Sequence, residues 1–363
     1  MRSDTGTGQR RRRTIDPVRI DGRAIGAGAP PYIVAELSAN HGGLIERALR
    51  IVELAAEAGA DAIKFQAYTA ESLTLDCETA GFTIESDGPW NNRSLFDLYR
   101  EAATPYDWFP ELYACARKCG ITPFTSPFSA DVLDMLESLG SPAYKIASFE
   151  AVDHGLIASC AATGKPLIIS TGLCRLDEIE EAVAVARDNG CKEIILLKCN
   201  SAYPARLEEA NLLGIPALSE HFDLPVGYSD HSLGICAPIA ACALGACMIE
   251  KHFIDAREPS TADSRFSAVP SELREIVVQC RNAYAARGRV SFGPTDQERP
   301  SLVFRRSLHA TRDIAAGETF TNDNVRSIRP GYGLKPKHLP EVLNKRARRA
   351  LKRGEPLDWD VVS

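Results

Sequence analysis

The sequence lacks the features that would place a protein in a membrane or outside the cell. No apolar stretch is long and charge-free enough to span a bilayer, and the basic start is not followed by the apolar segment of a signal peptide. The eleven cysteines are odd in number and form no CxxC pair. Several lie inside apolar runs, as buried thiols in a reducing compartment do. We therefore expect a soluble, cytoplasmic protein without a disulfide framework.

An excess of positive charge is also lacking. The formal net charge of -6 at pH 7 argues against a dedicated nucleic-acid binder. The arginine run at 10–13 lies in a start without apolar periodicity, so residues 1–30 are expected to be a disordered basic tail and lead-in rather than a polyanion-binding arm. The chain of 363 residues is otherwise of ordinary globular composition and long enough for one large domain and a small one.

Short apolar segments alternate with helical patterns between residues 31 and 286. Strands are expected at 32–36, 62–66, 121–125, 143–147, 166–170, 193–198, 224–231 and 246–252. Helical runs such as 44–58 and 177–189 end before a glycine, which is typical of a helix C-terminus. Eight such units predict an α/β protein with a (β/α)8 TIM barrel. A doubly wound open sheet is the alternative, but it would not require eight regular units.

Polar residues follow the predicted strands where they end. In a TIM barrel the active site lies at this face, so these side chains are expected to lie together. They are Glu36; Lys64 and Gln66; Thr125 and Ser126; Lys145 and Ser148; Ser170 and Thr171; Asn200 and Ser201; Ser229, Asp230 and His231; and Glu250, Lys251 and His252. One such residue alone would be an ordinary solvated loop residue, but all eight groups together indicate a site.

His231 and His252 end two successive strands joined by the apolar helical run 234–245. A strand, helix and strand joined so closely form a βαβ unit, which leaves the two strands parallel and both histidines on one side. We interpret the pair as metal ligands rather than as two core histidines. Two protein ligands make an open site completed by water or substrate oxygens, and Mn²⁺, Mg²⁺ or Zn²⁺ fits it. Such an ion would polarise a carbonyl oxygen.

The same rim offers donors for a small anion such as phosphate. The cations are Lys64, Lys145 and Lys251, and the hydroxyls are those of Ser126, Ser148, Ser170 and Ser229. Each lysine alone could equally extend from a strand end into solvent. Glu36 is a candidate general acid/base, and the long irregular stretch 70–92 is a candidate lid. These residues predict a metal-assisted enzyme acting on a phosphorylated or carboxylated small molecule.

The character of the sequence changes after the barrel. Residues 287–305 are predicted to be a linker and 306–363 a small β domain. The pattern Ile314-x-x-Gly317-Glu318-x-Phe320 returns as Leu351-x-x-Gly354-Glu355-x-Leu357. This echo predicts two related turns of one domain. A domain this small buries little apolar area alone and is expected to dock on its own barrel or on that of a partner.

Several of these segments resemble the sialic acid synthase family. They are Ala35 to Gly42, Lys64-Phe65-Gln66, Tyr144 to Ser148, Ser170-Thr171-Gly172, Ser229-Asp230-His231 and Glu250 to Phe253. Residues 307–362, with Arg329-Pro330-Gly331, resemble the C-terminal antifreeze-like (SAF, β-clip) domain of that family. Within it, residues 36–40, 94–99, 144–150 and 201–204 are most similar to the pseudaminic acid synthases, and less so to the legionaminic and N-acetylneuraminic acid synthases.

The resemblance implies the condensation of phosphoenolpyruvate (PEP) with 2,4-diacetamido-2,4,6-trideoxy-L-altrose, giving pseudaminic acid and phosphate. It implies metal binding by His231 and His252, with Mn²⁺ as the first choice among divalent ions. PEP would contact Lys64, Gln66, Ser126, Lys145, Ser148, Ser170, Ser201 and Ser229. Glu36 would transfer protons, and Tyr203, Asp263 and Arg329 would face the sugar. Arg329 would come from the SAF domain of the other subunit in a domain-swapped homodimer.

Two positions differ from the usual family pattern. Asn200 stands where threonine is usual, and residues 259–263 lack the Gly-Pro or Ser-Pro step before Asp263. Both lie on the sugar side of the site and bear on the substrate more than on the reaction. Two other functions are compatible with the residues: a Schiff-base aldolase using Lys64 or Lys145, and a non-catalytic carbohydrate-binding protein.

Overall fold

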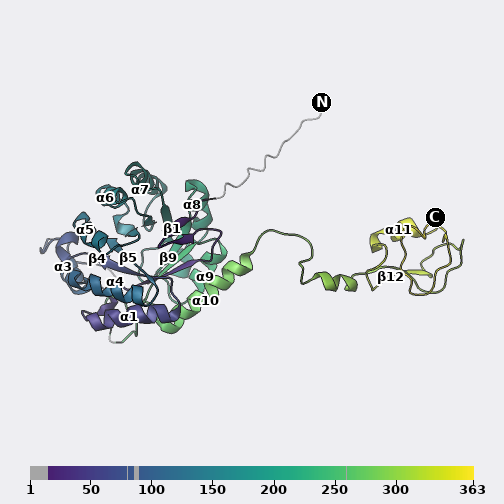
Figure 1. Ribbon diagram of the computed structural model, residues 1–363, viewed down its shortest axis with the longest axis horizontal. Coiled ribbons are helices and arrows are strands. Elements are labelled where there is room, and N and C mark those ends of the chain that lie inside the picture. Colours follow the sequence, from purple (N-terminus) through teal and green to yellow (C-terminus); the bar gives the residue numbers. More distant parts are fainter. Residues whose placement is uncertain (1–14, 80, 86–89, 259) are drawn as a thin grey trace, which may run out of the picture. The chain divides into compact units, whose positions relative to one another are not determined.

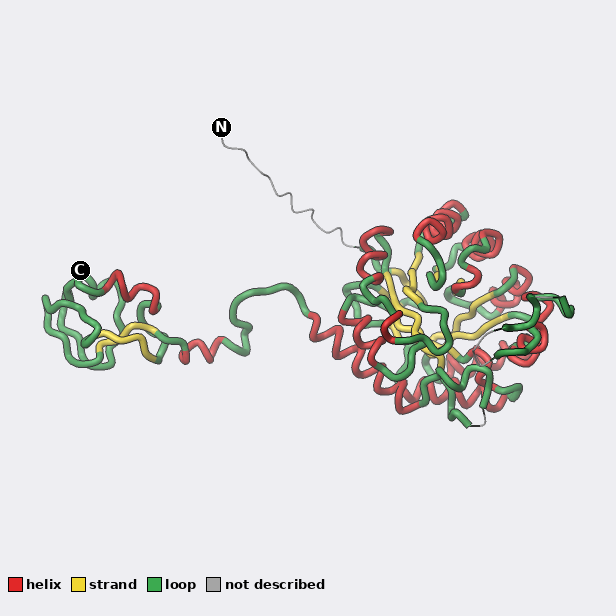
Figure 2. Tube along the Cα trace, turned by 180° about the vertical axis from the view of Figure 1, so that it is seen from behind, coloured by secondary structure: helices red, strands yellow, loops and turns green. Residues whose placement is uncertain are grey.

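Eight parallel strands close into a barrel surrounded by helices (Figures 1 and 2). We describe a computed structural model that covers residues 15–79, 81–85, 90–258 and 260–363. The barrel strands are β3 (Tyr32–Glu36), β4 (Ala62–Ala67), β5 (Thr122–Pro127), β6 (Tyr144–Ile146), β7 (Leu167–Ser170), β8 (Ile194–Cys199), β9 (Val226–Asp230) and β10 (Met248–His252). Strand β10 pairs with both β9 and β3 and so closes the ring. The predicted TIM barrel is confirmed.

Helices follow the strands around the outside of the barrel. They are α1 (Ile45–Ala58), α2 (Ala70–Leu73), α3 (Leu95–Ala102), α4 (Phe109–Lys118), α5 (Leu133–Ser138), α6 (His154–Ala162), α7 (Leu176–Asp188), α8 (Gly214–Phe222), α9 (Cys236–Ala243) and α10 (Pro270–Arg287). Helix α1 ends where Gly59 adopts φ +90°, a left-handed conformation that glycine accepts without strain. Every residue of β3, β9 and β10 is buried, including the polar and charged residues at the carboxyl ends of these strands.

A short β-hairpin, β1 (Val18–Ile20) and β2 (Arg23–Ile25), precedes the barrel and was not predicted from the sequence. Val18, Ile20 and Ile25 are buried in one cluster with the apolar side chains of the barrel interior, such as Phe124 and Met248. The hairpin therefore covers part of the barrel's interior core, within a region expected to be only a lead-in. The arginine run at 10–13 lies outside the described residues.

The chain divides into two compact units, Met1–Gly288 and Arg289–Ser363. The predicted linker contains a 3-10 helix, Arg299–Phe304. The C-terminal unit pairs β11 (Ser307–Ala310) with β12 (Val325–Ile328) in antiparallel fashion and includes the short helix α11 (Leu339–Val342). Its own apolar core contains Leu308, Phe320 and Leu357.

The two copies of the sequence repeat in this unit form two equivalent turns. Gly317 and Gly354 have φ values of +80° and +87°. The glutamate that follows each glycine accepts a hydrogen bond from the backbone N–H three residues before it, at 2.9 Å in both turns. Ile314 and Leu351, the first residues of the two copies, pair directly. The repeat therefore reflects a shared turn chemistry.

Among the described residues, no helix combines the length and the apolar character needed to cross a membrane.

Candidate active site

The register of the barrel brings the predicted rim residues side by side. His252 on β10 is the partner of Glu36 on β3, and Glu36 is the partner of Lys64 on β4. Gln66 is in turn the partner of Ser126 on β5. Residues distant in the sequence thus share the carboxyl ends of neighbouring strands, where the active site of such a barrel lies.

Four buried charged residues form the centre of this rim. The Lys64 ammonium lies 2.7 Å from the Glu36 carboxylate and 3.8 Å from that of Glu250, while Lys145 lies 3.5 Å from Glu250. All four side chains are almost inaccessible to solvent. Two cations and two carboxylates therefore compensate one another in a region of low dielectric.

Burial and the two carboxylates shift the pKa values of the two lysines in opposite directions. Burial lowers the pKa of Lys145, because the desolvation of its ammonium outweighs the attraction of Glu250. Burial opposes the charge of Lys64 as well, but Glu250 and Glu36 raise its pKa above the usual value. The pKa of Glu250 is held low against its own burial by Lys145 and Lys64. The pair of lysines thus depends on Glu250 as a shared counter-ion.

Hydroxyl groups surround these charges. Lys64 donates to Ser126 Oγ at 3.3 Å, and Ser229 Oγ donates to Glu250 at 2.9 Å. Ser170 Oγ is buried and has no hydrogen-bond partner among the described residues, so it is available to a bound molecule. The predicted PEP residue Gln66 instead donates to Glu36 at 2.8 Å.

Gly172 allows the loop after β7 to approach two further predicted residues. Its backbone N–H donates to Ser148 Oγ at 3.2 Å. A Cβ atom at this position would lie 2.7 Å from Ser148 Oγ and would also overlap Ser201 Oγ. A side chain larger than hydrogen would therefore displace Ser148 and Ser201, whose hydroxyls lie close around this glycine and form a cradle suited to an anion.

His231 and His252 lie next to each other, with ring centroids 5.3 Å apart. If an ion lies about 2.1 Å from one nitrogen of each ring, the two ring centroids can be up to roughly 6.6 Å apart. The observed separation of 5.3 Å therefore allows the two rings to share an ion. His231 Nδ1 lies 2.7 Å from the carbonyl oxygen of Asn200, which fixes it as the protonated nitrogen and leaves Nε2 as a free ligand. His252 Nδ1 is buried without a hydrogen bond, 3.4 Å from Asp263.

The donor set around the histidines fits a catalytic rather than a structural metal. Among the described residues there is no group of three or more His, Cys, Asp or Glu side chains that could hold an ion. Two imidazoles with a carboxylate behind one of them leave most coordination positions to substrate or water, as in an open site. Asp263 lies on the Nδ1 side of His252, so a ring oriented by this carboxylate has Nε2 left to bind an ion.

Tyr203 and Asp263, predicted to face the sugar, lie beside the histidines. The Tyr203 ring is 4.3 Å from the ring of His231 and 6.2 Å from that of His252. Arg329 belongs to the C-terminal unit, where its side chain is exposed and, among the described residues, has no ion-pair partner. Its backbone is held in place, since Pro330 O accepts from Ser307 Oγ at 2.6 Å and from His309 Nε2 at 2.8 Å.

One of the three lysines predicted to bind the anion takes no part in this cluster. The Lys251 ammonium is buried against Asp230 Oδ2 at 2.7 Å and also bonds the carbonyl oxygen of Ser232. Successive residues of a strand point to opposite faces, so Lys251 faces away from the side that Glu250 and His252 share. The prediction that Lys251 contributes to the anion site is wrong.

Glu250 was predicted among the polar residues at the strand ends, but its position between the two lysines as their counter-ion was not. Three other residues of the site were not singled out from the sequence. Glu150, after β6, has its Oε2 buried without a partner, and burial raises the pKa of this carboxyl group to about 7. Phe266 and Trp90 pack near Tyr203, at 5.2 and 5.7 Å between ring centroids. No local sequence pattern marks Glu150, Phe266 or Trp90 individually as a residue of the site.

Comparison with known proteins identifies relatives of both units. Residues 51–291 match the model of the NeuB family, and residues 305–363 match that of the SAF domain. The pseudaminic acid synthase of Campylobacter jejuni subsp. jejuni serotype O:23/36 is 42% identical over 90% of this chain and 95% of its own. That of Helicobacter pylori is 41% identical over 92% of this chain and 98% of its own.

Other similar proteins are more distant. The N,N'-diacetyllegionaminic acid synthase of Campylobacter jejuni subsp. jejuni serotype O:2 is 35% identical over 89% of this chain and 97% of its own. The crystal structure of an N-acetylneuraminic acid synthetase from Leptospira borgpetersenii superposes with a TM-score of 0.70. It is 34% identical and covers 79% of this chain and 95% of that structure.

Proposed function

This chain belongs to the NeuB family, and we propose that it is a transferase that condenses PEP with 2,4-diacetamido-2,4,6-trideoxy-L-altrose to give pseudaminic acid and phosphate. The observation that carries the proposal is the identity of 41–42% to pseudaminic acid synthases over at least nine tenths of the chain, against 35% to a legionaminic acid synthase. The family resemblance predicted from the sequence is thereby confirmed.

The proposed reaction needs one new carbon–carbon bond and the release of phosphate. C3 of PEP attacks the aldehyde carbon of the open-chain sugar, and the aldehyde oxygen takes up a proton. The hydroxyl of a water molecule adds to C2, and the bond between C2 and the phosphate oxygen breaks. The products are a 2-keto acid with three more carbons than the sugar, and inorganic phosphate.

The buried lysines and the cradle around Gly172 suit PEP, which carries a phosphate and a carboxylate. Lys64 and Lys145 supply positive charge where almost no water reaches. The Ser170 hydroxyl, unpartnered in the described structure, and the hydroxyls of Ser148 and Ser201 supply orientation. PEP would thus lie over the barrel axis with its reactive carbon toward the histidines.

We assign proton transfer to two carboxyl groups. Glu36 is held by Lys64 and by the side-chain amide of Gln66, so its position is well defined. Glu150 has a pKa raised by burial to about 7, so a substantial fraction carries a proton at neutral pH. We assign Glu150 as the acid that protonates the aldehyde oxygen and Glu36 as the base that activates water.

His231 and His252 would hold a divalent ion, Mn²⁺ by family resemblance, which when bound would polarise the aldehyde carbonyl. The protein's part is to orient the two rings, through the Asn200 carbonyl behind one and the Asp263 carboxylate behind the other. Tyr203 and Phe266 pack against these rings and limit the access of water to them.

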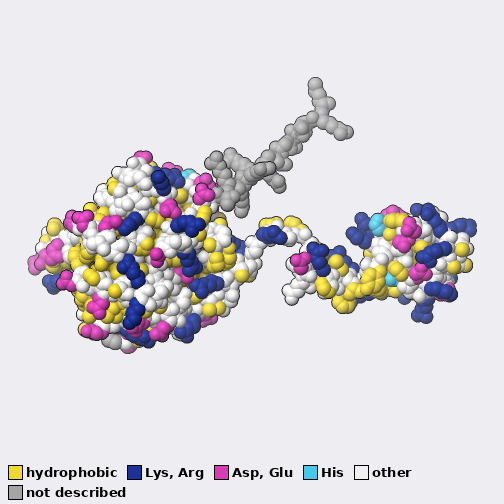
Figure 3. All heavy atoms as spheres, viewed as in Figure 1, with side chains coloured by type: hydrophobic (Ala, Val, Ile, Leu, Met, Phe, Trp, Pro, Cys, Tyr) yellow, Lys and Arg dark blue, Asp and Glu magenta, His cyan; other side chains and the backbone are white. Residues whose placement is uncertain are grey.

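We further propose a homodimer in which the C-terminal unit of one chain covers the barrel mouth of the other. Residues 289–363 contain fifteen Lys and Arg against nine Asp and Glu, whereas the rest of the chain contains 27 against 39. Figure 3 shows basic side chains spread over the visible face of the C-terminal unit. Opposite net charges favour the association of the two units.

The barrel rim has an apolar surface that supports such a cover. Phe149, Leu173, Leu213 and Leu233 follow four neighbouring strands at their carboxyl ends, and each is more than half exposed. Exposed apolar residues on successive loops at one end of the barrel are typical of an interaction surface. The eleven free cysteines are in keeping with the cytoplasmic location that we also propose.

Arg329→Ala is expected to raise the KM for the sugar by about tenfold or more, the loss of one charged hydrogen bond, with little change in the KM for PEP. The side chain is exposed on a backbone that Ser307 and His309 hold still, as a preorganised donor requires. Steady-state kinetics with each substrate varied in turn measure the effect. Arg326→Ala, also exposed on the same unit, is the control. Equal changes in both KM values would remove the proposed role.

The activity itself is tested by phosphate release from PEP with a panel of N-acetylated amino sugars, with and without Mn²⁺. We expect release with the 2,4-diacetamido-2,4,6-trideoxy-L-altrose and little with N-acetylmannosamine. Faster release with the isomer that gives legionaminic acid would favour that alternative substrate. Absence of release with every sugar would contradict the synthase assignment.

One observation favours a second candidate, a Schiff-base aldolase. Burial lowers the pKa of Lys145, and a lysine amine with a lowered pKa is what imine formation needs. The assay that separates the two functions is borohydride trapping with a keto acid. We expect no trapped adduct, since Lys145 is paired with Glu250 rather than free. A stable adduct on Lys145 would favour the aldolase.

A further inference from the structure

Three aromatic side chains from separate parts of the chain meet beside the histidine pair. The Tyr203 ring lies 4.3 Å from His231, and Phe266 lies 5.0 Å from His252. Trp90 joins them from the irregular stretch predicted as a lid, at 5.7 Å from Tyr203 and 6.4 Å from Phe266. We call these three rings the aromatic wall. It begins at the proposed metal ligands and continues away from them to Trp90.

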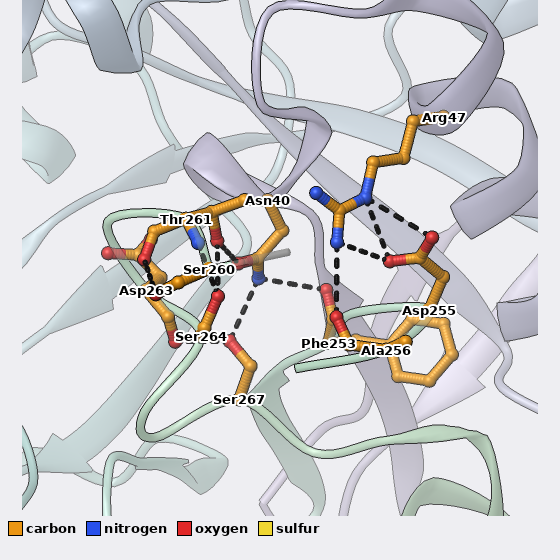
Figure 4. A network of polar contacts seen from close by, with 10 residues as sticks. All are labelled: Asn40, Arg47, Phe253, Asp255, Ala256, Ser260, Thr261, Asp263, Ser264 and Ser267. Carbon is orange, nitrogen blue, oxygen red and sulfur yellow. Dashed lines mark hydrogen bonds and ion pairs between the residues drawn. The ribbon is translucent and has the colours of Figure 1, made fainter. Parts of the chain in front are cut away.

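The loop that carries part of the aromatic wall is anchored to the barrel by hydrogen bonds. Asn40, after β3, accepts a hydrogen bond from Thr261 Oγ1 at 2.7 Å and donates to Ser267 Oγ at 2.8 Å (Figure 4). The same amide donates to the carbonyl oxygen of Phe253 at 3.0 Å. Phe253, Thr261 and Ser267 are thus tied to the first barrel loop, and Asp263 and Phe266 lie between the last two of these anchored residues.

Trp90 is attached directly to that segment. Its indole N–H donates to the carbonyl oxygen of Ala262 at 3.2 Å, next to Asp263. A tryptophan that is held at its polar end presents its ring face in a defined direction. The ring also contacts Tyr203 and Phe266, so both the polar and the apolar part of this side chain are in contact with residues of the site.

A wall of this chemistry discriminates between sugars. Aromatic faces pack well against methyl groups and offer no hydrogen-bond partner to a hydroxyl, which loses its water without compensation. The trideoxy diacetamido sugar has a methyl group at C6 and an acetamido methyl at C4. N-Acetylmannosamine has hydroxyls at both carbons. With the aldehyde carbon at the histidines, as the proposed function requires, C4 to C6 would extend away from them along the aromatic wall that ends at Trp90.

We propose that Trp90 is a specificity-determining residue whose ring packs against a methyl group at C4 or C6 of the sugar. This inference rests on the proposed function, since it concerns the substrate of that reaction. Trp90 does not touch the reacting atoms and takes no part in binding PEP. Its contribution is to favour the methyl-bearing sugar over the hydroxylated one.

The test compares kcat/KM for the trideoxy sugar and for N-acetylmannosamine in the wild type, Trp90→Ala and Trp90→Phe. We expect the preference for the trideoxy sugar to fall by about tenfold or more in Trp90→Ala, the size expected for the loss of methyl packing. Trp90→Phe retains an aromatic face and is expected to keep part of the preference. The KM for PEP is expected to stay at its wild-type value in both variants.

Two analogues distinguish the methyl groups. One has the C4 acetamido group with a C6 hydroxyl, and the other is 6-deoxy with a C4 hydroxyl. The analogue whose kcat/KM falls in Trp90→Ala identifies the methyl group that contacts the ring. Trp359→Ala, which removes a half-exposed tryptophan of the C-terminal unit, is the matched control and should leave the preference unchanged.

The outcomes separate this inference from the proposed function. A wild-type enzyme that prefers N-acetylmannosamine overturns the proposed function. A wild-type enzyme that prefers the trideoxy sugar, with the same preference in Trp90→Ala, overturns the role of Trp90 alone. A parallel rise in the KM values for PEP and for both sugars shows a general structural defect and also overturns it.

Discussion

His231→Ala is expected to lower turnover by about 10³-fold or more, since a carbonyl-polarising ion contributes several kcal/mol to such a reaction. The physical reason is the small number of protein ligands: among the residues that the structure describes, only two imidazoles lie where an ion could be shared, 5.3 Å apart between ring centroids. Removal of one leaves a single nitrogen, which cannot hold an ion in competition with water. Phosphate release from PEP measures the turnover.

A second readout makes this prediction independent of activity. Titration of Mn²⁺ into the protein, followed by the electron paramagnetic resonance signal of the free ion, should show one site in the wild type and none in His231→Ala. His221→Ala is the matched control, because His221 is exposed and paired with Glu180 on the outer helices. Metal-dependent turnover retained in His231→Ala would count decisively against the two-histidine site.

Glu250→Gln is expected to lower the free energy of unfolding by about 3 kcal/mol, as the loss of one partner from a buried ion pair does. Lys145 lies 3.5 Å from this carboxylate, and Lys64 shares it at 3.8 Å. Without it, two ammonium groups remain in a region that solvent hardly reaches, and only Lys64 keeps a second carboxylate, that of Glu36. Urea unfolding followed by circular dichroism measures the loss.

PEP should reverse part of this loss, because its phosphate and carboxylate replace the missing charge. We expect saturating PEP to raise the unfolding midpoint of Glu250→Gln by more than it raises that of the wild type. Glu53→Gln, in a solvent-exposed pair with Arg50, is the control and should leave the midpoint unchanged. A variant as stable as the wild type would show that Glu250 is not the counter-ion of the lysines.

The barrel and much of its rim could be predicted from the sequence because both follow from local patterns. Apolar strands separated by helical runs imply parallel strands, and parallel strands place all their carboxyl ends at one face. Glu36, Lys64 and His252 therefore had to be neighbours, and they are register partners. No knowledge of the loops was needed for that step.

The sequence did not show which side chains of the last barrel strand face the inside of the barrel. Residues 248–252 are all buried, so their sequence shows no alternation that would tell the inner face from the outer one. Glu250 and Lys251 were both plausible members of the charged cluster. The structure places Glu250 between the lysines and pairs Lys251 with Asp230.

The sequence by itself determined the fold class, the family and the identity of the chemical groups at the strand ends, because strand periodicity and motif order are properties of short segments. Only the tertiary structure decided which groups meet across long separations. Trp90 bonds a carbonyl 172 residues away, and the β1–β2 hairpin packs into the interior core of the barrel. Such contacts depend on the packing of loops against a finished barrel, and no local periodicity encodes them.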